Sequence, residues 1–485
     1  MVFPIVGGTQ STGYDVANSL MFNASEGTDY LSRQNSSGGS RQTFTISFWY
    51  KRASTTSGMK MFTVGTSTST DTGLFTIHHD ANGRLIVAGG ATTYRTTSQS
   101  FRDSTAWYHL VVAVDSTDGT ADDRVKIYMN GSQLTSFDAG SSGTMTQNQN
   151  TPVNEANKYH EIGRNQPSTN QYFDGIICEF NQVDGAQLTP NYFGEFNSEG
   201  VWVPVKPGTG AGGAINYGTN GAFLEFKQTG SGQNSSGTGA DTSGNDNHFA
   251  RNGLSAPKSG WQDTCTNNFM TLNYNLPDGQ FNTSEFTKGG TNYNADQGND
   301  GAGQPTGTFA LKSGKWYWEV RVPSEQNNRA LGFCRMDRVS IDNPPQLHGT
   351  GFSATNSVVG INLQDDTIDQ VDNAGSHTQH ASGLTGMSND DIFGVALNMD
   401  DGNFQFYRNG SAYGSSYNLD NASEWQEHGA VPCATGGSYQ AFQFNFGNPP
   451  YSNSSSQTDG LYGDFEYAPP SGYYACCTKR LAEFG

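Results

Sequence analysis

Charged residues are scarce in this sequence, and basic residues are the scarcer kind. Only 15% of the 485 residues are charged, and 26 Lys and Arg against 45 Asp and Glu give a formal net charge of −19. A surface of this sign repels the phosphates of nucleic acids and of anionic lipids. We therefore expect neither a nucleic acid nor a membrane surface among the partners of the protein.

Long hydrophobic runs are also missing. No stretch approaches the ~20 apolar residues that a membrane-spanning helix needs. The N-terminus, residues 1–8, has no basic segment and too short an apolar run for a secretory signal peptide. We expect no membrane insertion, and a protein that matures in the cytosol or leaves it by a route without a cleaved signal.

The cysteines are few and are not spaced for a metal. The six Cys form no Cys-x-x-Cys pair and fit no zinc-site spacing. Cys178 lies in an apolar segment, where it is typical of a small core residue. The sequence predicts six reduced thiols and no cofactor that depends on them.

Glycine and aromatic residues are abundant. The chain has 61 Gly, and 12% of its residues are Phe, Trp or Tyr. Many turn residues with few charges indicate short strands joined by turns, whereas disordered chains lack aromatic residues. The length allows about three domains at ~150 residues each. The fold class that we predict is all-β.

Two segments far apart in the chain carry the same hairpin signal. Residues 125–129 and 403–408 alternate apolar and polar side chains, and each run enters an Asn-Gly turn, at 130–131 and at 409–410. Asn-Gly between alternating strands is the strongest short-range hairpin signal. The repetition predicts two antiparallel β-sandwiches in tandem.

The composition divides the chain into four parts. Residues 1–18 form an N-terminal arm, 19–197 a first sandwich, 198–275 a Gly/Ser-rich connector, and 276–485 a second sandwich. The connector is either a flexible linker or, as Trp202 and Trp261 indicate, partly packed on its neighbours.

Two strands and two loops are predicted in most detail. Phe44, Ile46, Phe48 and Tyr50 alternate with polar or mixed positions, and so do Trp316, Trp318, Val320 and Val322, so each set should line one sheet face. The polar segments 337–355 and 364–390 predict long loops, where binding usually occurs.

Both sandwiches resemble known families. Residues 19–23, 44–49, 107–110, 127–131 and 173–175 follow the order seen in LamG/concanavalin-like jelly rolls, and together they span most of the first sandwich. Residues 314–320, 331–333, 393–400 and 406–410 resemble a SPRY domain.

The connector and the C-terminus resemble parts of structural proteins of tailed bacteriophages. Residues 241–247 and 263–273 are similar to a connector between such modules, and 469–481 to the segment that closes their SPRY part. The resemblance implies a virion protein: a tail or head fibre, or a decoration protein. It implies assembly in the host cytoplasm and a homo-oligomer on the particle.

Catalytic and metal-binding patterns are weak. Concanavalin-like glycosidases carry Glu-x-Asp-x-x-Glu, and the nearest match, Glu179-Phe180-Asn181-Gln182-Val183-Asp184, has Asn at the second acid. His78 and His79 are adjacent and face opposite sides of a strand. Asp115, Asp118 and Asp122 are weak candidates for a Ca²⁺ site, since they follow no EF-hand spacing.

Sugar recognition requires aromatic faces beside hydrogen-bonding groups. We expect Tyr94, Tyr172 and Trp425 in loops, as candidates for glycan or receptor binding, although each could equally close its own sandwich. In the arm, the apolar residues Val2, Phe3, Ile5 and Val6 are candidates for docking to a virion partner.

The interpretation favoured by the sequence is a non-enzymatic virion surface protein of a tailed phage. It would bind host-surface glycan or neighbouring virion proteins. Two alternatives remain: a glycan-degrading enzyme on a concanavalin-like fold, and a cellular adhesin or binding module.

Overall fold

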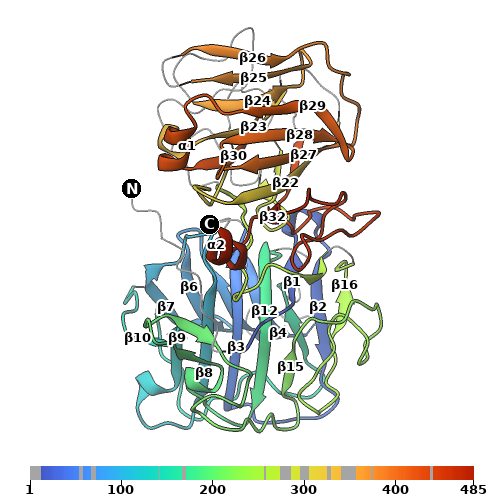
Figure 1. Cartoon of the computed structure of the whole chain (residues 1–485). Coiled ribbons are helices and arrows are strands. Elements are labelled where there is room, and N and C mark those ends of the chain that lie inside the picture. Colours follow the sequence, from blue (N-terminus) through green and yellow to red (C-terminus); the bar gives the residue numbers. More distant parts are fainter. Residues whose placement is uncertain are drawn as a thin grey trace. The chain divides into compact units, whose positions relative to one another are not determined.

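In the computed structural model, the chain forms two compact units (Figure 1). It describes residues 13–53, 58–66, 73–140, 142–165, 171–255, 258–273, 286–294, 305–324, 329–339, 357–372, 375–436 and 441–485. The first unit ends at Asn267, and the second begins at Asn268. Within the described residues, no helix has the length and apolarity to cross a lipid bilayer.

The first unit is built on two antiparallel sheets. In spatial order, one sheet, here called the β3 sheet, contains β10 (Ser132–Leu134), β9 (Val125–Met129), β8 (Tyr108–Asp115), β3 (Thr43–Arg52), β12 (Gly175–Asp184), β1 (Ser19–Phe22) and β17 (Ser259–Trp261), with β15 (Ala222–Leu224) paired to β12. The other, the β2 sheet, contains β16 (Ala250–Asn252), β2 (Tyr30–Gln34), β11 (Tyr159–Ile162), β4 (Lys60–Gly65), β5 (Phe75–His79), β6 (Arg84–Gly89) and β7 (Thr92–Ser100). A separate ribbon pairs β13 (Gly194–Phe196) with β14 (Trp202–Pro204), and three 3₁₀ turns are η1 (Ala24–Glu26), η3 (Ala121–Asp123) and η4 (Pro190–Tyr192).

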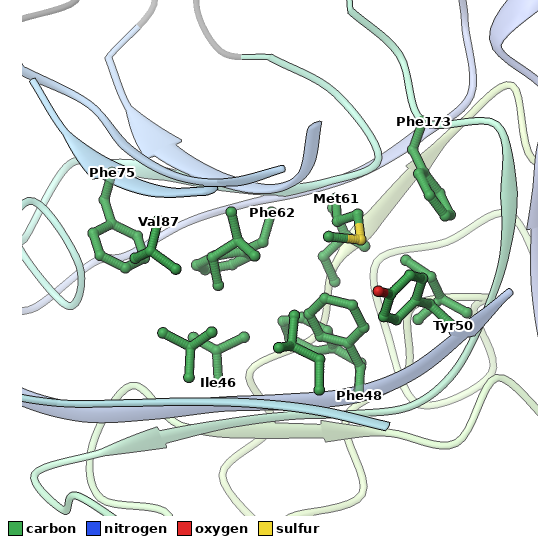
Figure 2. Close-up of a cluster of buried hydrophobic side chains, with 14 of the residues drawn as sticks. Ile46, Phe48, Tyr50, Met61, Phe62, Phe75, Val87 and Phe173 are labelled. Atoms are coloured by element: carbon green, nitrogen blue, oxygen red, sulfur yellow. The ribbon is translucent and has the colours of Figure 1, made fainter. Parts of the chain in front are cut away.

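The core of this unit lies between the two sheets. Ile46, Phe48 and Tyr50 point from β3 toward Phe62 and Phe75 of the opposite sheet (Figure 2). Alternate residues of a strand face opposite sides, which is why the predicted face of β3 is the buried one. The predicted alternation in this strand is confirmed, because all four residues of that face are fully buried in this core.

The hairpin turn predicted at residues 130–131 is confirmed. Asn130 and Gly131 have φ of 47° and 79°, and Met129 pairs with Ser132 across the turn. Two successive residues with positive φ define the turn that matches the twist of adjacent strands. The turn at 409–410 repeats it, with φ of 47° at Asn409 and 77° at Gly410.

Much of the segment assigned to a connector supplies strands to the first unit. β15 pairs with β12, β16 with β2, and β17 with β1, so residues from 222 to 261 extend both sheets of the sandwich. Figure 1 shows β16 beside β2 at one edge of the β2 sheet.

The second unit is again built on two sheets. One, the β23 sheet, contains β18 (Leu272–Asn273), β21 (Thr306–Gly307), β30 (Ala430–Gly436), β23 (Arg329–Arg335), β24 (Val358–Asn362), β25 (Thr367–Val371) and β26 (His377–Ala381). The other, the β22 sheet, contains β19 (Phe286–Thr287), β20 (Asn292–Asn294), β31 (Ala441–Asn445), β22 (Lys315–Val322), β27 (Asp391–Asn398), β28 (Asn403–Arg408) and β29 (Ser411–Asn418), with β32 (Tyr474–Ala475) parallel to β22. Its helices are α1 (Ala422–His428) and α2 (Thr478–Phe484), and η6 (Met336–Arg338) is a 3₁₀ turn.

Strand β22 separates two packed layers in this unit. Trp316, Trp318, Val320 and Val322 lie in the main core, as the alternation predicts. On the other face, Glu319 accepts hydrogen bonds from the backbone amides of Glu466 and Tyr467, at 3.0 and 2.9 Å. Burial raises the pKa of Glu319 to about 7 although these donors oppose the shift. The carboxyl thus anchors the C-terminal segment to the sheet.

One loop prediction is wrong. The polar segment 364–390 contains β25 and β26, which extend the β23 sheet beyond β24. Its polarity arises because β26 is an edge strand with half-exposed or exposed side chains. In the other predicted loop, residues 340–355 lie outside the described residues.

Candidate functional site

The outer face of the β3 sheet is covered by the chain itself. Phe193 packs there with Val111, Ala113 and Val183. Trp202 and Cys265 pack with Trp49 and Cys178 in the same way. The outer side of β12, the strand that carries the nearest match to the glycosidase acid motif, is therefore packed against other segments of this chain.

A Ser-His pair on that face has the wrong proton arrangement for nucleophilic catalysis. The indole N–H of Trp202 donates to Nδ1 of His109 at 3.0 Å, and Nε2 of His109 lies 3.0 Å from Ser47 Oγ. An indole can only donate, so Nδ1 is the acceptor and Nε2 carries the proton. Burial lowers the pKa of His109 to about 3, so the ring stays neutral. His109 therefore donates to Ser47 and cannot take its proton, and it is a buried residue of β8.

The carboxyl of Glu179 is strongly perturbed by its surroundings. Glu179 lies in a β-bulge of β12, with φ of 52°, and its Oε2 accepts a hydrogen bond from Tyr14 at 2.9 Å. Burial, and secondarily the nearby Glu225, raise the pKa of Glu179 to about 8. The other positions of the acid motif serve different purposes: Asn181 accepts from the Tyr217 hydroxyl, and Asp184 accepts from the amides of Ser40 and Asn220.

The raised pKa of Glu179 predicts a specific dependence of stability on pH. An acid whose pKa rises from 4.5 to about 8 on folding stabilises the fold below pH 4.5 and loses that contribution as pH rises through 8. Between pH 4.5 and 8, the titration of Glu179 should lower the free energy of unfolding by at most about 1.4 kcal/mol per pH unit. Urea unfolding of wild type and Glu179→Gln at pH 5 to 9 measures this free energy.

The difference between these two proteins isolates Glu179 from other titrating groups. The Gln variant should gain stability relative to wild type as pH rises, because its amide still accepts from Tyr14 and carries no charge. Glu195→Gln, the same substitution at an exposed position of β13, is the matched control. A pH-independent difference for Glu179→Gln would refute the assignment.

The histidine and aspartate candidates for a metal site are used within the fold. His79 bonds the Tyr50 hydroxyl at 3.0 Å and the Gly83 carbonyl at 3.2 Å, which uses both ring nitrogens. Asp115 accepts from Thr117, Asp118 from the amide of Thr120, and Asp122 pairs with Arg95. Within the described residues, no three His, Cys, Asp or Glu side chains are grouped to hold a metal ion.

Two of the three predicted glycan-binding aromatics are buried in regular elements, which corrects their expected place in loops. Tyr94 lies in β7 and is 1% exposed, and its hydroxyl accepts from the amide of Gln149. Trp425 lies in α1, is 1% exposed, and packs edge-on against Phe333. Neither ring offers a face to a ligand, because each fills a sandwich core. The docking candidates Val2, Phe3, Ile5 and Val6 lie outside the described residues.

Tyr172 lies in a segment that is neither helix nor strand, and its side chain is also buried, at 8% exposed. Its ring centroid is 6.5 Å from that of Tyr30 in β2. An open pocket, here called the β2 pocket, encloses about 570 Å³ on the outer face of the β2 sheet. It is lined by Tyr30, Ser32, Gln34, Tyr159, Glu161, Arg164, Gln233, Ala250 and Asn252.

Strand alternation explains the shape of the β2 pocket. Leu31 of β2 faces the core, so Tyr30, Ser32 and Gln34 face outward. Across the sheet, Ser32 pairs with Ala250 of β16 on one side and with Glu161 of β11 on the other. Small side chains at Ser32 and Ala250 thus form the floor, and larger side chains on the neighbouring rows form the walls.

A fixed ion pair lies in this pocket. Arg164 donates from Nε and Nη2 to the two carboxylate oxygens of Glu161, at 2.8 and 2.6 Å. Its guanidinium also lies 3.6 Å from the ring centroid of Tyr30, and Ser32 Oγ donates to Glu161 at 3.2 Å. Such bidentate, stacked contacts hold the guanidinium in one orientation. Two tyrosines, Tyr30 and Tyr159, with neutral amides around them, then complete the lining.

Comparisons with known proteins agree with this architecture. Residues 25–191 match a family model described as the concanavalin A-like lectin/glucanases superfamily, and residues 315–449 match the SPRY domain. The chain thus carries a LamG/concanavalin-like domain and a SPRY domain, both of binding type. No curated protein matches the chain.

Three similar solved structures illustrate the two domains. A native heptameric SAP-like pentraxin from Limulus polyphemus is 18% identical over 36% of this chain and 80% of its own, with a TM-score of 0.28. The PSpry domain of TRIM65 is 16% identical over 36% of this chain and 89% of its own, with a TM-score of 0.26. The SPRY domain of human HERC1 is 14% identical over 32% of this chain and 87% of its own, with a TM-score of 0.23.

Sequence reasoning missed most of the β2 pocket. Residues 30–34 contain one aromatic residue, Tyr30, and the segment has no turn signal or motif that marks a site. The other walls come from residues 159–164 and from residues 233–252, which join β2 only through sheet pairing. Of the predicted residues, only Tyr172 lies near the pocket.

Proposed function

We propose that this chain is a non-enzymatic virion surface protein of a tailed phage that binds a glycan of the host surface through the β2 pocket. The pocket carries the proposal: about 570 Å³ lies within the ~300–1,000 Å³ typical of ligand pockets, and it combines tyrosine rings with amide and hydroxyl groups. A sugar ring has an apolar C–H face and a polar rim, which such a lining complements.

The virion location rests on the sequence resemblance of residues 241–247, 263–273 and 469–481 to phage structural proteins. On this proposal the partners are other virion proteins, the chain is a homo-oligomer on the particle, and it assembles in the host cytoplasm. Mass spectrometry and antibody labelling of purified particles test this location. Absence of the chain from the particles would refute it.

The absence of catalysis is part of the same proposal. Two observations support it. Other segments of the chain pack on the outer face of the β3 sheet. His109 donates its proton toward Ser47 and so cannot act as a base for it. Incubating the protein with host polysaccharide should release no new reducing ends. Sustained release would instead establish the glycan-degrading alternative.

Binding through the β2 pocket predicts a position-specific loss of affinity. Tyr159→Ala removes one aromatic wall at a half-exposed position of β11 and should weaken binding to host-surface polysaccharide at least about tenfold, since each lost 1.4 kcal/mol is one factor of ten. Titration calorimetry or glycan-coated biosensors measure the change.

A matched aromatic variant outside the pocket is the control. Phe196→Ala removes a ring that is 54% exposed on β13, and it should leave the affinity unchanged. Equal losses in both variants, or none in Tyr159→Ala, would place the binding surface elsewhere.

A further inference from the structure

We infer that the ligand of the β2 pocket is an uncharged saccharide, and that sugars bearing carboxylate or sulfate groups are disfavoured there. This inference rests on the proposed glycan-binding function and specifies the substrate class. It follows from how the charges of the pocket are arranged.

Among the described residues that line the pocket, the two charged side chains, Glu161 and Arg164, neutralise each other. Both carboxylate oxygens of Glu161 accept from Arg164, and the side chain of Glu161 is 1% exposed. Arg164 is in addition stacked on Tyr30 and is 13% exposed. An arginine held in this way offers little uncompensated charge to an anionic ligand, because its bidentate site is already filled by a carboxylate.

The remaining lining is neutral and can both donate and accept hydrogen bonds. Gln34, Gln233 and Asn252 each carry an amide with two donors and an acceptor, and Tyr30 and Tyr159 add hydroxyl groups. Gln34 and Gln233 each donate once to a backbone carbonyl, those of Asn157 and His248. A sugar hydroxyl likewise donates and accepts. The pocket therefore has groups suited to hydroxyls, with the ring of Tyr159 for the C–H face.

The net negative charge of the whole chain also disfavours acidic saccharides. A net charge of −19 repels an approaching polyanion before any contact forms. A neutral saccharide meets no such barrier, so its affinity should be nearly independent of ionic strength. An acidic saccharide would instead bind better as salt screens the repulsion.

The experiment compares saccharides that differ only in charge. Uronic-acid oligosaccharides, their carboxyl-reduced counterparts and a panel of neutral oligosaccharides are titrated against the full chain at 50 and 500 mM salt. A carboxyl-reduced form should bind at least tenfold more tightly than its acidic parent, with affinity unchanged by salt. Tighter binding of the acidic form would overturn the inference while leaving glycan binding intact.

Two variants at one half-exposed position test whether the pocket sets this preference. Asn252→Lys adds a positive charge to the lining, and it should raise the affinity for the acidic form severalfold. Asn252→Asp should lower it further. Because both variants also remove the Asn252 amide from the lining, the quantity compared is the ratio of the affinities for the acidic and the neutral form. Identical charge preferences in both variants would exclude the β2 pocket as the source of selectivity.

A third variant tests the role of the buried acid as a positioning residue. Glu161→Gln removes the charge that neutralises Arg164, so the preference should shift toward acidic sugars, which a purely structural role would not cause. Thermal unfolding checks that this variant is folded. If neither neutral nor acidic saccharides bind wild type, the proposed function fails, and the inference fails with it.

Discussion

Replacing Lys51 by methionine is expected to lower the free energy of unfolding of the first unit by about 3–5 kcal/mol. Lys51 lies on β3, and its Nζ is 2.9 Å from Oδ2 of Asp263, with the two side chains 2% and 0% exposed. Removing the cation leaves a buried carboxylate without this charge partner; the carboxylate also accepts from the indole N–H of Trp107, at 3.1 Å. Urea unfolding followed by tryptophan fluorescence measures the loss.

A double variant separates the cost of the orphaned charge from the cost of lost packing. Lys51→Met with Asp263→Asn removes both charges and keeps an oxygen that can accept from Trp107, so it should recover most of the stability. Lys126→Met breaks the half-exposed pair with Asp123 and should cost at most about 1 kcal/mol. A loss in Lys51→Met no larger than in this control would contradict the buried ion pair.

Trp425→Ala should destabilise the second unit by about 3–5 kcal/mol, the usual cost of removing a large aromatic side chain from a core. The ring is 1% exposed, and its centroid is 5.5 Å from that of Phe333 in β23, at an interplanar angle of 73°. Differential scanning calorimetry of the full chain should show the unfolding transition of this unit shifted downward.

The same variant separates a core role from the sugar-binding role that the sequence predicts for Trp425. A core residue loses stability on truncation, whereas a sugar platform loses affinity and keeps its melting temperature. Leu461→Ala, at a side chain of the same unit that is 62% exposed, is the control and should change stability by no more than about 0.5 kcal/mol. Unchanged melting of Trp425→Ala with lost sugar affinity would restore the binding interpretation.

The sequence predicted the local parts of the fold well because they depend on neighbours in the chain. Residues 130 and 131 require positive φ at both turn positions, and the alternating face of β3 repeats every second residue, so a window of a few residues contains each signal. The same holds for Trp316 and Trp318 of β22.

Long-range pairing is what the sequence could not show. The β2 pocket joins residues near 30, 160 and 250, and nothing in residues 250–252 indicates that this short strand pairs with Tyr30–Gln34. Tyr94 and Trp425 have polar neighbours in the sequence, so they were expected in loops. Burial depends on what packs over a ring, which in both cases comes from distant segments.

The pairing of β16 with β2 also limits how the chain can be divided. Ala250 and Asn252 line the β2 pocket, yet they lie well beyond residue 191, where the match to the lectin-like family ends. A recombinant fragment trimmed to that match, or a chimera joined there, would lack this part of the lining. A lectin-like domain of this kind would have to be exchanged together with the segment that follows it. A fragment used in glycan screens should likewise extend to at least residue 267, where this unit ends.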